Sequence, residues 1–222
     1  MTRRLLARVL PALTLVATIL PSAPASAARI KVLIVGDSVA SVLRWAPESM
    51  VPLWKSNYDV TLETWGCQKL ISVGCLGNGQ KSAYDYIRKH RNDGLQYVMV
   101  ATGYDDTGAE HVRFAIRKIN RLVTSMGAKL VWLTYRVNGN VRVKNVAFNK
   151  VVWEESKSLG FEVFDWELIA RRMKHWYAGD RVHFNRRGGR YFGNHIKKYL
   201  DQLTGVVPPT TLAPSTTTGA RS

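Results

Sequence analysis

Ser38 is the first residue of this chain whose type and position suggest chemistry. It follows a short apolar run at 32–35 and the break Gly36-Asp37, and a spacing compatible with a helix resumes over 39–54. A serine at such a strand-to-helix turn stands at the carboxyl edge of a sheet, where backbone N–H groups at the helix start can face a developing anion. The same residues also fit a plain turn in which Asp37 or Ser38 caps the helix.

A base and a carboxylate that could serve this serine occur near the C-terminus, at Asp180 and His183. A serine hydroxyl is a poor nucleophile until an imidazole takes its proton. A carboxylate on the other ring nitrogen fixes the tautomer and stabilises the imidazolium. A spacing of three residues on a loop lets Asp180 touch the ring of His183 while both side chains face Ser38. We expect the other four histidines in surface or packing roles, and His183 stands apart from them only through its partners Asp180 and Ser38.

Alternating strands and helices supply the edge at which these groups can meet. After the first strand we expect strands at 58–64, 95–102, 129–135 and 161–165, and helices at 82–92, 110–126, 146–159, partly 168–176, and 191–203. This alternation implies parallel βαβ units with helices on both sheet faces. Ligands collect beyond the carboxyl ends of the strands in such a sheet. Ser38, Gly66, Asp105 and the loop with Asp180 and His183 should therefore converge on one edge.

The two ends of the chain differ in composition from the rest. Residues 1–27 combine three arginines, an apolar run and Ala25-Ser26-Ala27, the pattern of a cleaved secretory signal peptide, with a retained anchor as the weaker alternative. No later segment approaches the roughly 20 apolar residues that a membrane span needs. Residues 28–204 should form one domain, and 205–222, rich in Pro, Thr and Ser, a disordered tail. The mature protein is therefore expected outside the cell or in the envelope.

Export determines how Cys67 and Cys75 are interpreted. In an oxidising compartment two cysteines eight positions apart favour a disulfide. Two ligands alone make a poor zinc site. A phosphate site at the Gly36 turn is a minor alternative, because that turn lacks the further glycines of a dinucleotide or phosphate loop. We therefore expect neither a metal nor a cofactor.

The charge of the chain is strongly positive. Removing residues 1–27 takes three of the 32 basic residues and none of the 16 acidic ones, which leaves 29 against 16, a formal charge of +13. For an exported protein, anionic envelope polymers, anionic glycans or acidic lipid head groups are better partners than nucleic acid. An ordinary solvated basic surface remains the alternative.

Four short motifs, taken in order, resemble those of the SGNH hydrolases, also called the GDSL esterase/lipase superfamily. They are Gly36-Asp37-Ser38, Gly66 after the second strand, Gly103-Tyr104-Asp105-Asp106 after the third, and Asp180 to His183 near the C-terminus. The resemblance extends from residue 30 to about residue 203. It implies a three-layer α/β/α fold, with a flavodoxin-like parallel sheet of about five strands in an order resembling 2-1-3-4-5.

The resemblance also implies roles for single residues. Ser38 would be the nucleophile, His183 the base and Asp180 its orienting carboxylate. The oxyanion hole would use the backbone N–H groups of Ser38 and Gly66, with an Asn side chain from the third motif. Asp105 takes the place of that Asn here, and an ionised carboxylate has no hydrogen to donate.

Three functions are compatible with these residues. The leading one is an exported serine esterase that removes acyl groups, with acetyl as the expected case, from a carbohydrate or envelope glycan. The second, favoured by Asp105, is a weakly active or non-catalytic module of the same fold that binds anionic glycan. An O-acyltransferase would use the same acyl-enzyme. Trp65, Trp166 and Trp176 could form the floor of a sugar site or pack in the core.

Overall fold

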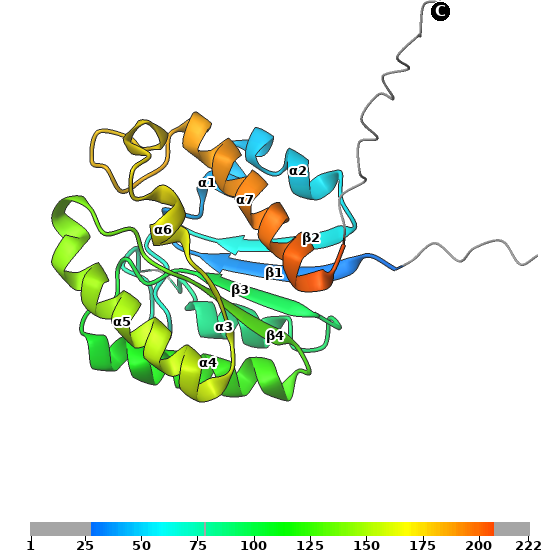
Figure 1. The fold of residues 1–222 in the computed structure, drawn as a ribbon. Helices are drawn as coiled ribbons and strands as arrows, with labels where there is room; N and C mark the ends of the chain where they lie inside the picture. Colours follow the sequence, from blue (N-terminus) through cyan, green and yellow to red (C-terminus); the bar gives the residue numbers. More distant parts are fainter. Residues whose placement is uncertain (1–27, 78, 207–222) are drawn as a thin grey trace, which may run out of the picture.

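A five-stranded parallel sheet in the order β2-β1-β3-β4-β5 runs through the domain (Figure 1). The computed structural model describes residues 28–77 and 79–206, so the predicted signal peptide and nearly all of the predicted tail lie outside the described residues. The strands are β1 (Ile30–Gly36), β2 (Tyr58–Thr64), β3 (Tyr97–Ala101), β4 (Lys129–Leu133) and β5 (Glu162–Phe164). The predicted strand order and parallel pairing are confirmed.

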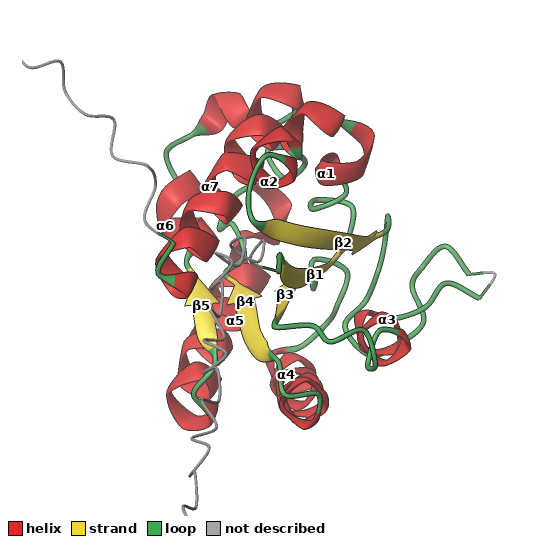
Figure 2. Ribbon diagram, turned by 90° about the vertical axis from the view of Figure 1, so that its right-hand side faces the viewer, coloured by secondary structure: helices red, strands yellow, loops and turns green. Residues whose placement is uncertain are grey.

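Helices cover both faces of this sheet and make three layers (Figure 2). One face packs against α1 (Val42–Trp45), α2 (Val51–Trp54), α6 (Trp166–Ala170) and α7 (Arg186–Thr204), and the other against α3 (Ala83–Lys89), α4 (Ala109–Ser125) and α5 (Arg142–Leu159). Within the described residues, no helix is both long enough and apolar enough to cross a bilayer. The predicted three-layer α/β/α class is confirmed.

The central strand β1 shows why the sequence folds this way. Successive side chains of a strand point to opposite faces. Val32 and Ile34 enter the core beneath α1 and α7, while Leu33 and Val35 enter the core beneath α3 and α4. All four are fully buried, so an apolar run without alternation is what a strand covered on both faces requires.

The single helix expected over 39–54 is wrong. Residues 38–41 form a turn, and the chain continues as α1, the 3₁₀ helix η1 (Pro47–Ser49) and α2. Pro47 and Pro52 cause the breaks, because proline has no backbone N–H to continue a helix and is tolerated in its first turn. Both prolines lie in the first turn of their short helices.

The closing helix begins earlier than the expected 191. α7 starts at Arg186, where the side chain of Asn185 accepts a hydrogen bond from the backbone N–H of Gly188 at 2.9 Å and so caps the helix. The glycines in the first half of this helix hid the start from propensity reasoning. Gly193 has a packing role, since a Cβ there would lie 1.8 Å from the backbone oxygen of Ser49. α7 can therefore pack closely against η1.

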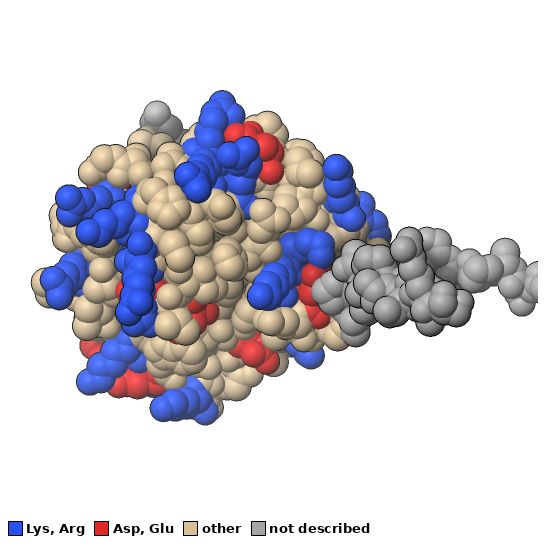
Figure 3. Space-filling view, turned by 45° about the horizontal axis from the view of Figure 1, so that its top comes forward, with Lys and Arg blue, Asp and Glu red and all other residues tan. Residues whose placement is uncertain are grey.

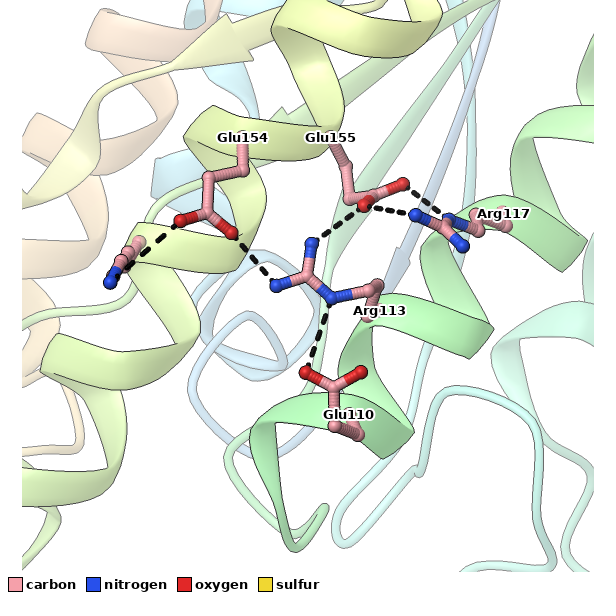
Figure 4. Close-up of polar contacts among 6 residues, drawn as sticks. Glu110, Arg113, Arg117, Glu154 and Glu155 are labelled. Carbon is pink, nitrogen blue, oxygen red and sulfur yellow. Dashed lines mark hydrogen bonds and ion pairs between the residues drawn. The ribbon is translucent and has the colours of Figure 1, made fainter.

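An ion-pair cluster joins α4 to α5 on the other face (Figure 4). Arg113 contacts Glu110, Glu154 and Glu155, and Arg117 makes two bonds of 2.7 and 2.8 Å to Glu155. The side chain of Glu155 is only 3% exposed, so its charge depends on these two arginines. The cluster stabilises the scaffold and lies apart from the residues of the candidate site.

Candidate active site

Ser38 lies in the turn that follows β1, and its hydroxyl meets the histidine expected from the sequence. The Oγ atom of Ser38 is 2.8 Å from Nε2 of His183, although the two residues are 145 positions apart. On the other side of the ring, Nδ1 of His183 lies 2.5 Å from Oδ2 of Asp180. The three residues thus form a continuous hydrogen-bonded chain of serine, imidazole and carboxylate.

Backbone donors orient Asp180 toward the ring. Its Oδ1 atom accepts hydrogen bonds from the N–H groups of Val182 at 2.9 Å and His183 at 3.0 Å. Burial raises the pKa of the Asp180 carboxyl, but the hydrogen bond to the His183 ring and these two N–H groups outweigh it and hold that pKa below its usual range. Asp180 is therefore charged at neutral pH, as a carboxylate that stabilises an imidazolium must be.

Arg136 supports the loop that carries this pair, a role that sequence reasoning missed. It follows β4, is 2% exposed, and donates a hydrogen bond from its guanidinium to the backbone oxygen of Arg181. The same guanidinium lies 3.6 Å from the ring centre of Tyr177, at the start of the loop. The only sequence signal for this role is that Arg136 directly follows the strand expected at 129–135. Its hydrogen-bond partner is a backbone oxygen 45 positions away, which leaves no pattern in the sequence.

Asp37 links the turn of Ser38 to the end of β3. Its carboxylate is fully buried and accepts hydrogen bonds of 3.0 Å from the N–H groups of Val39, Gly103 and Tyr104. Burial raises the pKa of Asp37 to about 7, against the lowering effect of the three N–H groups. The bond to Val39 resembles the helix cap considered from the sequence, but the bonds to Gly103 and Tyr104, in the segment after β3, give Asp37 its larger structural role.

Gly103 is required at the end of β3 for two reasons. Its φ of 137° lies in a region that other residues rarely adopt, and a Cβ there would lie 2.3 Å from Oη of Tyr135. The chain then turns so that Asp105 lines the cleft in front of Ser38, while Asp106 is buried and accepts a hydrogen bond from the N–H of Leu70 at 3.0 Å. Burial raises the pKa of Asp106.

The cleft has a volume of about 450 Å³ and contains all three residues of the serine–histidine–aspartate chain. Its walls also include Asp105, Asn140 and Lys144, whose ammonium group donates to the backbone oxygen of Tyr104. Sequence reasoning did not select Asn140 or Lys144, which both come from the segment after β4. The mixture of charged and amide groups makes the cleft polar.

Gly66 and the cysteines lie beside this cleft. Gly66 lines a neighbouring hollow of about 370 Å³ together with Ser41, in the turn of Ser38. Cys67 and Cys75 form the expected disulfide, with Cα atoms 5.5 Å apart. A carboxylate oxygen of Asp105 lies within 4.8 Å of both sulfur atoms, so Asp105 borders the loop that carries Gly66. Because the sulfurs are bonded to each other, they are not available as thiolate ligands.

The three tryptophans considered for a sugar site divide into two groups. Trp166 and Trp176 are almost fully buried and stack on each other at 5.9 Å, so they belong to the core. Trp65 is 38% exposed and lies between the guanidinium of Arg44, 3.8 Å from its ring centre, and the ring of Tyr86. Only Trp65 is therefore placed near the surface of the site.

Solved esterase structures share this architecture. The psychrotrophic esterase EstA from Pseudoalteromonas sp. superimposes with a TM-score of 0.64 at 10% identity over 79% of this chain and 98% of its own. The M. smegmatis aryl esterase gives 0.65 at 13% identity over 78% and 99%. A carbohydrate acetylesterase family member from Sinorhizobium meliloti gives 0.64 at 14% identity over 79% and 99%.

Sequence comparison does not add to this structural result, since no protein-family model matches the chain and a search of curated proteins finds no relative. At 10–14% identity the structural likeness establishes the fold and leaves the chemistry to the residues of the site. The resemblance inferred from the four motifs is confirmed at that level: the chain has the fold of the SGNH hydrolases.

Proposed function

We propose that this protein is an exported serine esterase that removes acyl groups, acetyl above all, from a carbohydrate or envelope glycan. The observation that carries the proposal is the hydrogen-bonded chain from Ser38 through His183 to Asp180 at the edge of a polar cleft. A binding protein has no need of this set. The esterase fold and the names of the structural neighbours support the same reaction class.

The proposed reaction has two steps. In the first, Oγ of Ser38 attacks the ester carbonyl carbon while Nε2 of His183 takes the hydroxyl proton, and the alcohol leaves with that proton. In the second, water attacks the acyl-enzyme with His183 again as base, and the carboxylic acid is released. A sugar hydroxyl in place of that water would give acyl transfer through the same intermediate. Asp180 stabilises the imidazolium in both steps.

The exposure of the site supports a substrate in which a small acyl group is esterified to a bulky polar alcohol. The side chain of His183 is 46% exposed and that of Asp180 is 49% exposed, so the ester is cleaved near the protein surface. A long acyl chain would need a deep apolar pocket, whereas six of the ten residues that line this cleft are polar or charged. The apolar hollow that shares Val39 and Tyr104 with the cleft has a volume of only about 20 Å³. Acetylated glycans have the required chemistry, and the Sinorhizobium meliloti neighbour is named a carbohydrate acetylesterase.

Export is part of the proposal. The signal-peptide pattern in residues 1–27 supports it, and so does the disulfide, since such bonds persist in oxidising compartments. The strongly basic composition is also suited to contact with anionic envelope polymers.

Asp105 favours a second candidate function, a weakly active module that binds glycan. By the motif resemblance Asp105 stands where the family has an amide donor, and Asp105 lines the same cleft as Ser38. An ionised Asp105 would repel the oxyanion of the tetrahedral intermediate rather than stabilise it. Measured turnover separates the two candidates.

The test combines a covalent probe with a small substrate. A fluorophosphonate should label Ser38, and Ser38→Ala should abolish both labelling and hydrolysis of an aryl acetate. Ser41→Ala is the matched control, because Ser41 belongs to the same turn and its hydroxyl bonds only the backbone oxygen of Asp37 within the described residues. An adduct on another serine, or no adduct at all, would favour the binding module.

A further inference from the structure

The C-terminal part of the domain carries a concentration of positive charge that the proposed reaction does not use. Residues 171–198 contain nine Lys or Arg residues and a single acidic one, Asp180, which is engaged with His183. Figure 3 shows the side of the molecule that carries α7, where Lys and Arg side chains outnumber Asp and Glu. This segment contains Asp180 and His183, so its charge lies close to the candidate active site along the chain.

A hollow of about 430 Å³ lies on the outer face of α7 and is lined by Arg187, Arg190, Tyr191 and Asn194. We call it the α7 hollow. The spacing of three and four residues places these side chains on one helix face. The opposite face, with Phe192 and Ile196, is buried in the core. The hollow therefore collects two guanidinium groups, an aromatic ring and an amide at one place.

The aromatic ring in the α7 hollow is held in a fixed position. Tyr191 stacks on Trp176 with ring centres 4.7 Å apart and an angle of 19° between the planes. The guanidinium of Arg187 lies 6.0 Å from the centre of the Tyr191 ring. An aromatic face beside a cation and an amide can contact the C–H face of a sugar while the polar groups bind its substituents.

The two arginines of the α7 hollow are free to bind an anion. Within residues 28–77 and 79–206, no carboxylate oxygen lies within 4.0 Å of Arg187 or Arg190, whereas the neighbouring Arg186 pairs with Glu48 at 3.0 Å. A guanidinium binds carboxylate and phosphate through paired N–H donors, which a neutral sugar cannot match.

We propose that the α7 hollow binds a glycan chain bearing carboxylate or phosphodiester groups, and so retains an anionic substrate on the helix that follows His183 in the chain. This inference rests on the proposed function for its connection to catalysis, but the binding itself does not need hydrolysis. Arg187, which lines the hollow, is four positions after His183 in the sequence. A hollow with a fixed ring and an amide suits a polysaccharide better than the flat surface of a bilayer.

The test measures binding by the full chain carrying Ser38→Ala, so that no ester is cleaved. The probes are polygalacturonate for carboxylates, poly(glycerol phosphate) for phosphodiesters, neutral dextran, and vesicles rich in acidic phospholipid. We expect calorimetric binding of at least one anionic polymer in 50 mM NaCl, none of dextran, and weaker binding in 500 mM NaCl because salt screens the charges.

A pair of charge-matched variants identifies the surface. Arg187→Gln with Arg190→Gln should weaken polymer binding about tenfold, the expected result of losing two charge-assisted contacts. Arg121→Gln with Lys157→Gln removes the same charge from exposed positions on α4 and α5 and should change binding less than twofold. Circular dichroism and the melting temperature check that both proteins fold.

Several results would overturn the inference. If both double variants lost polymer affinity equally, binding would depend on net charge and not on the α7 hollow. If the protein bound dextran as tightly as the anionic polymers, the arginines would have no role in recognition. Binding to acidic vesicles without binding to either polymer would assign the surface to a membrane. If the unchanged protein bound a polymer but did not hydrolyse aryl acetate, only the proposed function would be contradicted. If it hydrolysed aryl acetate but bound neither polymer, only this inference would be contradicted.

Discussion

The substitution Asp180→Asn tests how His183 is prepared for its proposed role as a base. Oδ1 of Asp180 accepts two backbone N–H groups at 2.9 and 3.0 Å, and Oδ2 lies 2.5 Å from Nδ1 of His183. In the variant the amide oxygen must stay with the backbone donors, so the amide nitrogen must face Nδ1. Its N–H then donates to Nδ1 and places the ring hydrogen on Nε2. Nε2 points at Ser38 and can no longer take its proton.

The expected loss follows from these contacts. A hydrogen bond to a charged group is worth about 1.5–3 kcal/mol. Forcing the productive tautomer against a facing N–H donor costs about the same again, giving about 3–6 kcal/mol in total. This corresponds to a loss of roughly 10²–10⁴-fold in kcat/KM. Asp180→Ala should lose only roughly 10–100-fold, because it removes the carboxylate without adding a donor, and water can accept from Nδ1 of the half-exposed ring.

Aryl acetate hydrolysis between pH 5 and 9 measures both variants. Asp93→Asn is the matched control, because Asp93 also lies three residues from its histidine partner, His90, at 2.7 Å and is 52% exposed. It should change kcat/KM less than twofold. If the Asn variant of Asp180 were more active than the Ala variant, the tautomer explanation would be refuted. If both stayed within threefold of the unchanged protein, Asp180 would not be the orienting carboxylate.

Three further predictions concern residues around the site. Asp105→Asn should raise aryl acetate hydrolysis at pH 7 by at least about tenfold, a modest part of the 100–1,000-fold that one hole donor is worth; unchanged or lower activity would assign Asp105 to substrate binding or loop structure. Reducing the Cys67–Cys75 bond should lower the melting temperature, since a short disulfide loop stabilises by roughly 2–3 kcal/mol; two free thiols in protein purified without reductant would contradict this. Burial raises the pKa of Asp37 from 3.8 to about 7, so between these pH values the folded protein keeps a proton that the unfolded chain loses. The contribution of Asp37 to the free energy of unfolding should therefore decrease as the pH rises from about 4 to 7. Urea titrations should show that Asp37→Asn removes this contribution, and an identical pH dependence in the variant would assign it to other groups.

The parts of the fold that the sequence predicted are those determined by local pattern. The apolar run at 32–35 could be recognised as a doubly covered strand because every residue in it is buried. The period of α4 was also clear, and its expected bounds differ from the observed ones by one residue at each end. The order of the strands came from the motifs, since periodicity does not say which strands are neighbours.

The errors have two sources, prolines that break an apolar period and tertiary contacts that leave no pattern in the sequence. Apolar spacing over 39–54 looked continuous, but Pro47 and Pro52 divide it into three short helices. Arg136 was missed because its partner is a backbone oxygen, which any residue supplies. Asp37 was recognised as part of a motif and as a cap, but its bonds to Gly103 and Tyr104 depend on strand pairing that the sequence does not display.

The alignment of Ser38 with His183 depends on a contact far from either side chain. The segment after Ser38 includes η1, and the segment after His183 is α7, which packs on η1. Gly193 lets the two backbones approach, since any side chain there would collide with Ser49. The bond of 2.8 Å between Ser38 and His183 tolerates little movement, because a hydrogen bond weakens once its donor and acceptor separate. A glycine inside α7 therefore contributes to the placement of His183, just as the contact with Asp180 contributes to the orientation of its ring.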